Sequence, residues 1–82
     1  MTITLKLYAS LMDHLPPGAR GHRVTLEVPE GATPRQVLEA QGVPEAEVHL
    51  ILVNGLFVPP SERDRPLKPG DVVAAWPAVA GG

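Results

Sequence analysis

Proline and glycine interrupt this chain so often that it can form only short elements of secondary structure. The 82 residues include ten prolines and eight glycines. These residues lie singly or in pairs between periodic segments and do not form one low-complexity tract. Because proline ends helices and strands and glycine favours turns, they act as boundaries. The sequence therefore predicts one small domain of short strands and short helices, and a length of 82 residues excludes two domains.

The first part of the chain contains two segments in which apolar and polar side chains alternate. Alternation is the pattern of a strand with one buried face. It predicts strands over residues 2–8 and 24–28. Apolar residues at helical spacing predict a short helix over residues 9–15, which Pro16 ends. The apolar positions of the two strands are Ile3, Leu5, Leu7, Val24, Leu26 and Val28.

One helix has a clear start signal. Thr33 precedes Pro34, and Gln36 follows at the position that completes a capping box. Proline is favoured at the first helical position because its missing N–H would be unpaired there anyway. We therefore predict that the main helix begins at Pro34 and ends near Gly42.

The second half of the chain predicts a hairpin and a final strand. A continuous apolar run over residues 50–53 precedes Asn54-Gly55, the strongest short hairpin signal, so residues 56–58 can pair back on a buried central strand. Residues 68–71 have proline and glycine placed for a type II turn. A last strand is expected over residues 72–76.

The order of these elements is that of the ubiquitin-like β-grasp fold. We predict an α+β domain over residues 1–76, with a mixed sheet of about five strands and one main helix packed across it. By analogy with that fold, the first and last strands should lie side by side and parallel in the middle of the sheet. Residues 77–82 are expected to form a flexible C-terminal tail that ends in Gly-Gly.

Composition and charge exclude several functions. With no cysteine, the chain can form no disulfide, thiolate zinc site, iron–sulfur site or cysteine nucleophile. The net charge is −2 and the basic residues are scattered along the sequence, so nucleic acid is not an expected partner. The first residues alternate and do not form an apolar run, so no signal peptide or membrane span is expected, and the predicted location is cytoplasmic.

No motif predicts catalytic or metal-binding side chains. The three histidines, His14, His22 and His49, lack the spacing of metal ligands, so no metal site and no bound cofactor are expected. The sequence contains no phosphate-binding glycine loop and no nucleophile motif. The remaining candidate is the C-terminal tail, which either presents its carboxylate to another enzyme's active site or is only a frayed end of the domain. Six residues reach at most about 20 Å, and glycine without a side chain can enter a narrow channel.

Several motifs together resemble one family. They are Asn54-Gly55, the segment Leu67-Lys68-Pro69-Gly70-Asp71-Val72-Val73-Ala74, the closing Val79-Ala80-Gly81-Gly82, and also Tyr8-Ala9-Ser10-Leu11 and Val28-Pro29-Glu30-Gly31-Ala32-Thr33. Over nearly the whole chain this pattern resembles the MoaD/ThiS family of ubiquitin-like sulfur carriers. It is most similar to the small subunit of molybdopterin synthase.

The resemblance implies a function for the tail. A ubiquitin-activating-type enzyme would use ATP to adenylate the Gly82 carboxylate, and a sulfur donor would convert the adenylate to a thiocarboxylate. Gly81 would give clearance in the partner's channel. The sulfur would pass to an acceptor enzyme such as the large subunit of molybdopterin synthase, for molybdenum cofactor biosynthesis. The carrier would be a subunit of a sulfurtransferase complex and would supply no catalytic side chain.

The same resemblance implies a docking surface, and it leaves other pathways open. We expect partners to bind the three aromatic residues and the tail. Alternatives are sulfur transfer for thiamine, tRNA thiolation or cysteine synthesis, attachment to protein lysines, or a β-grasp module that only binds a protein. The residues expected to contact partners are Tyr8, Phe57, Trp76, Val79 and Ala80.

Overall fold

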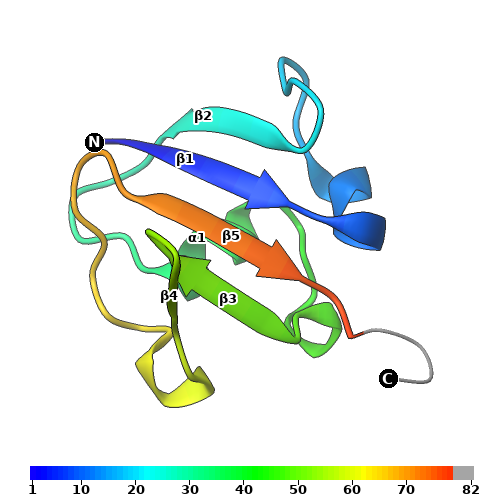
Figure 1. Ribbon diagram of the computed structural model, residues 1–82. Coiled ribbons are helices and arrows are strands. Elements are labelled where there is room, and N and C mark those ends of the chain that lie inside the picture. Colours follow the sequence, from blue (N-terminus) through cyan, green and yellow to red (C-terminus); the bar gives the residue numbers. More distant parts are fainter. Residues whose placement is uncertain (79–82) are drawn as a thin grey trace.

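The computed structural model describes residues 1–78 and places every predicted strand and helix within one or two residues. The segment predicted as a short helix over residues 9–15 is a 3₁₀ helix. Two further 3₁₀ turns, η2 and η3, were not predicted. In chain order (Figure 1) the elements are β1 Thr2–Leu7, η1 Ala9–His14, β2 Arg23–Glu27, α1 Pro34–Ala40, η2 Glu45–Glu47, β3 Leu50–Val53, β4 Leu56–Phe57, η3 Pro60–Glu62 and β5 Val72–Trp76.

The five strands form one mixed sheet in the order β2-β1-β5-β3-β4. The first and last strands, β1 and β5, are parallel neighbours at its centre, and Leu5 is opposite Val73. All other strand pairs are antiparallel. This order confirms the predicted β-grasp architecture. Because each central strand has a partner on both sides, neither is an open edge.

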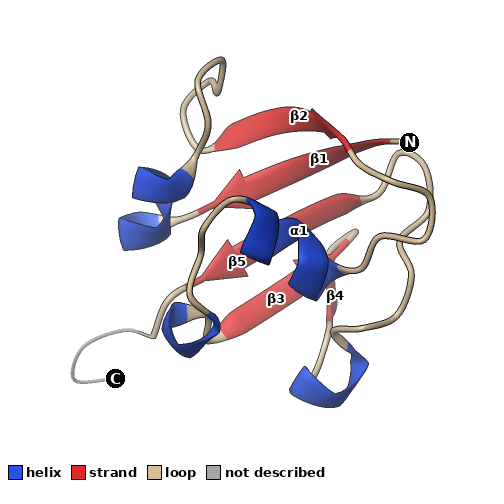
Figure 2. Cartoon of the chain, turned by 180° about the vertical axis from the view of Figure 1, so that it is seen from behind, coloured by secondary structure: helices blue, strands red, loops and turns tan. Residues whose placement is uncertain are grey.

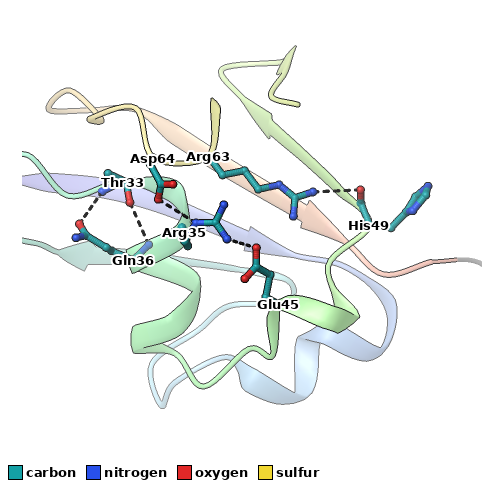
Figure 3. A network of polar contacts seen from close by, with 7 residues as sticks. All are labelled: Thr33, Arg35, Gln36, Glu45, His49, Arg63 and Asp64. Carbon is teal, nitrogen blue, oxygen red and sulfur yellow. Dashed lines mark hydrogen bonds and ion pairs between the residues drawn. The ribbon is translucent and has the colours of Figure 1, made fainter. Parts of the chain in front are cut away.

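Helix α1 is capped as the sequence predicts. The Thr33 hydroxyl accepts a hydrogen bond from the Gln36 amide at 3.2 Å, and the Gln36 side chain accepts one from the Thr33 amide at 3.1 Å (Figure 3). Two positions after α1 ends, Gly42 adopts a φ of +75°, a left-handed conformation that glycine tolerates without strain. The helix is therefore only seven residues long.

One face of the sheet packs against α1, and within residues 1–78 no helix lies over the other face (Figures 1 and 2). The core lies on the helix side, where alternate residues of β1 and Ile51 of β3 are buried. In β5, Val73 and Ala75 face this core, and Ala74, on the other face, is buried as well. The prediction of a fully buried strand over residues 50–53 is wrong in part: Ile51 is buried, whereas Leu50 and Leu52 are half-buried because they lie on the uncovered face. The core includes Ile3, Leu5, Leu7, Leu11, Val37, Leu38, Ile51, Val73 and Ala75.

The chain continues past β5 through Pro77, which is half-buried, and Ala78, which is exposed. The predicted tail residues Val79, Ala80, Gly81 and Gly82 lie outside the described residues. The division between residues 1–76 and 77–82 stays a prediction. Within residues 1–78, no helix is long and apolar enough to cross a bilayer.

Candidate functional site

The uncovered sheet face carries all three aromatic residues of the chain. Trp76 is opposite Leu50, and Phe57 is opposite Leu52, so both lie on the face away from Ile51 and α1. Tyr8 continues β1 in extended conformation, and its amide donates to the Ala75 carbonyl at 3.2 Å. Strand alternation therefore places Tyr8 on the same face as Trp76.

Tyr8 and Trp76 form a stacked pair. Their ring centroids are 4.3 Å apart, and the ring planes differ by 5°. A second contact, with the His22 ring at 4.6 Å and a tilt of 32°, supports Tyr8 from the β2 side. These contacts fix the position of both large rings at the end of β5, next to the start of the predicted tail.

Aliphatic residues extend this pair into a larger surface. Leu50 and Leu52, which are half-buried, join the aromatic residues across the strand pairs β3·β5 and β3·β4, and the buried Ala74 lies between them on β5. The most exposed member is Phe57, which is 60% exposed. The sequence did not identify Leu50 and Leu52 as surface residues. They belong to a continuous apolar run, and such a run lacks the alternation that would show which side chains lie on which face of the sheet. The apolar patch consists of Tyr8, Leu50, Leu52, Phe57, Ala74 and Trp76.

Backbone and side-chain hydrogen bonds fix the end of β5 beneath this patch. The His49 amide donates to the Trp76 carbonyl at 2.9 Å, and the Arg63 guanidinium donates to the His49 carbonyl at 3.3 Å (Figure 3). Arg63 is only 6% exposed, and its Nε has no hydrogen-bond partner among residues 1–78. Burial, and then the charge of Arg35, lower the pKa of the Arg63 guanidinium.

Arg35 of α1 forms ion pairs with two other segments of the chain. Its guanidinium pairs with Asp64 at 2.9 Å and with Glu45, and both carboxylates are exposed. The cavity beside Arg35 and Arg63 has a volume of about 20 Å³, which accommodates one water and no cofactor. Among residues 1–78, no three histidine, cysteine or acidic side chains are placed to hold a metal ion.

The fold is shared with several solved structures. Small archaeal modifier protein 1 (SAMP1) from Haloferax volcanii is 23% identical, covers 100% of both chains and has a TM-score of 0.70. Putative molybdopterin converting factor subunit 1 from Pyrococcus furiosus is 29% identical over 95% of this chain and 98% of that chain, with a TM-score of 0.67. A chain in the Helicobacter pylori complex of molybdopterin-converting factor subunits 1 and 2 is 16% identical over 100% of both chains, with a TM-score of 0.62.

These similarities agree with the motifs that indicated a MoaD/ThiS-like protein. No curated protein sequence matches the chain at a significant level. A family model described as Mut7-C ubiquitin matches residues 1–81, nearly the whole sequence. With its ubiquitin-like sheet order and its likeness to molybdopterin converting factor subunit 1, this chain belongs to the Mut7-C ubiquitin family.

Proposed function

We propose that this chain is a sulfur carrier whose Gly82 carboxylate becomes a thiocarboxylate and donates sulfur for molybdopterin synthesis. The observation that carries this proposal is the apolar patch at the end of β5, on the sheet face that has no helix. A partner that binds this patch would have the following residues, 77–82, within reach. The 29% identity to a putative molybdopterin converting factor subunit 1 supports the choice of pathway.

The proposed chemistry explains why the carrier needs a partner. A terminal carboxylate with a pKa of about 3.5 is ionised at neutral pH and resists nucleophiles. A carboxylate oxygen of Gly82 would attack the α-phosphorus of ATP in the adenylating enzyme, and pyrophosphate would leave. Hydrosulfide, or a donor equivalent to it, would then attack the acyl carbon and expel AMP, which takes the bonding electrons. The product is the thiocarboxylate.

The same surface would serve two partners in turn. One tail can enter only one active site at a time, so the adenylating enzyme and the sulfur acceptor would each dock on the apolar patch. Phe57 and the Tyr8–Trp76 pair would be the anchors, since large aromatic side chains dominate binding energies at interfaces. Val79 and Ala80 would contact the partner at the entrance of its channel, which Gly81 and Gly82 would enter.

Conjugation is the second candidate function. The TM-score of 0.70 with small archaeal modifier protein 1 favours it. In that case the same Gly82 acyl group would be attacked by a lysine amine, with loss of AMP or a thiolate and formation of an isopeptide bond. Gly-Gly remnants on lysines of other proteins would reveal it. Sulfur transfer for thiamine, tRNA or cysteine would use the same first steps and differ only in the acceptor.

Intact-mass spectrometry tests the proposal. The mass of the protein from its native source first establishes whether the chain ends at Gly82. The purified chain is then incubated with ATP, the adenylating enzyme of the same source and sulfide. We expect an acyl-adenylate, followed by the oxygen-for-sulfur mass shift. Persistent absence of both products with an enzyme active on another carrier would refute the sulfur-carrier function.

Tail variants serve as controls for that experiment. Deleting Gly82, or adding one residue after it, should abolish activation with no loss of folding. One residue shifts the reacting carbon by about 3.5 Å, as far as the whole approach distance of about 3–3.5 Å. Gly81→Val should fail as well, because its side chain would block the channel. An extended variant that is thiolated without trimming would contradict this geometry.

A further inference from the structure

One line of paired residues crosses the whole uncovered face, from basic side chains on β2 and β1 to apolar side chains on β3 and β4. Arg23 of β2 is opposite Lys6 of β1, and Lys6 is opposite Ala74 of β5. The line continues through Leu52 of β3 to Phe57 of β4. Figure 1 shows the order of these strands in the sheet. Opposed residues share a face, so this face has a cationic end on β2 and β1 and an apolar end on β3 and β4.

Two cations of this line are directly opposed. Alternate residues of β1 direct their amides to β5, as Thr4 does to Asp71 and Tyr8 to Ala75. Lys6 therefore faces Arg23 as a non-hydrogen-bonded pair, in which Cα atoms are about 4.5 Å apart and side chains are closest. Like charges at such positions destabilise a sheet. The stability of the sheet therefore does not explain why Lys6 and Arg23 are opposite each other.

A third cation extends the line at the sheet edge. Arg20 and Arg23 exchange two backbone hydrogen bonds, of 2.9 and 3.2 Å, so their side chains share a face. Among residues 1–78, the described ion pairs include none of these three cations. Residues that are scattered in the sequence thus gather on one surface. The cationic row consists of Lys6, Arg20 and Arg23.

We propose that the cationic row is the electrostatic half of the docking face and that it selects a protein partner with acidic side chains beside an apolar contact. The inference deepens the proposed function, because it assumes that the apolar patch is where the adenylating enzyme binds. Apolar contacts hold the complex once it has formed. Complementary charge mainly accelerates correctly oriented encounters and excludes wrong partners.

Protection against aggregation and nucleic-acid binding are two roles that fit the cationic row less well. Edge strands often carry cations that prevent aggregation, but Lys6 lies on β1, an interior strand. Single-stranded nucleic acid would need free aromatic faces for base stacking. Here Tyr8 and Trp76 stack on each other and Tyr8 also contacts His22, so Phe57 is the one largely exposed ring of the apolar patch. Three cations on a chain of net charge −2 also make a small footprint for a phosphate backbone.

Charge reversal tests the proposal. The variant Lys6→Glu/Arg23→Glu is compared with Lys68→Glu/Arg65→Glu, which changes the net charge equally at exposed positions outside the cationic row. Stopped-flow fluorescence measures the association rate constant with the adenylating enzyme, without ATP, at low and high salt. The wild-type rate should fall as salt rises. The first variant should associate at least about tenfold more slowly at low salt and lose that salt dependence, and the control should stay within about twofold of wild type.

Three results would overturn the proposal. These are a wild-type chain that does not associate, a salt-independent wild-type rate, or equal effects of the two double variants. Tight binding of a fluorescent single-stranded oligonucleotide that depends on Lys6 and Arg23 would point to nucleic acid instead. Thiolation in the same preparations separates the two proposals. A chain that binds through the cationic row but is never thiolated contradicts only the proposed function, and equal thiolation rates after reversal contradict only this inference.

Discussion

Truncation of Phe57 tests whether the apolar patch is a binding surface. Its ring is 60% exposed, so folding leaves most of it in water. Of the roughly 150–250 Å² that a buried aromatic side chain covers, about 90–150 Å² remain for a partner to bury. At about 25 cal/mol per Å², and with Cβ retained in alanine, Phe57→Ala should cost about 2 kcal/mol of binding free energy, or about thirtyfold in Kd.

The neighbouring residue provides a matched control. Leu56 is 73% exposed and opposite Val53, so it lies on the helix side of the same hairpin. Leu56→Ala removes a comparable exposed apolar side chain from the other face, and we expect binding to change by less than about twofold. Isothermal titration calorimetry of both variants against the adenylating enzyme and the sulfur acceptor measures Kd. Circular dichroism checks that each variant is folded.

Two results would refute this reasoning. If folded Phe57→Ala binds both enzymes as tightly as wild type, the hairpin is outside the interface. If Leu56→Ala weakens binding as much as Phe57→Ala does, the partner recognises the tip of the hairpin and the uncovered face has no special role. A loss with one enzyme alone would show that the two partners do not share the patch.

Two further predictions concern stability. Thr33→Ala removes the capping box with Gln36 and should lower the free energy of unfolding by about 1 kcal/mol, seen as a Tm lower by roughly 4–8 °C in thermal denaturation; an unchanged Tm would show that the cap contributes nothing. Arg63→Met keeps an apolar stem and removes a buried charge, so its unfolding free energy should stay within about 1 kcal/mol of wild type, whereas Arg63→Ala should lose about 2 kcal/mol. Urea titration distinguishes these values, and equal losses in both variants would assign the effect to the missing bond with His49.

The elements of this fold could be predicted from the sequence because their signals are local. The capping box acts within one helical turn, and Asn54-Gly55 is a strong local signal for a two-residue hairpin. Alternation shows which side chains of β1 and β2 are buried. Three of the patch residues, Tyr8, Phe57 and Trp76, had been selected from the sequence as expected partner contacts because of the family resemblance, and their contact with partners stays a prediction.

What surrounds each residue was decided only by tertiary structure. Tyr8 and Trp76 meet because parallel pairing joins the first and last strands. That pairing was predicted only by analogy with the β-grasp fold, and no local signal specifies which residues stack across it. The same register gathers Lys6 with Arg23, although charge counting along the sequence had indicated scattered cations. Arg63, in a loop for which the sequence predicts no burial, is buried because this loop packs against the start of β3, where the guanidinium donates to the His49 carbonyl. The periodicity of a sequence shows which side chains of one strand lie on the same face. Which residues lie beside them on the neighbouring strands depends on long-range pairing.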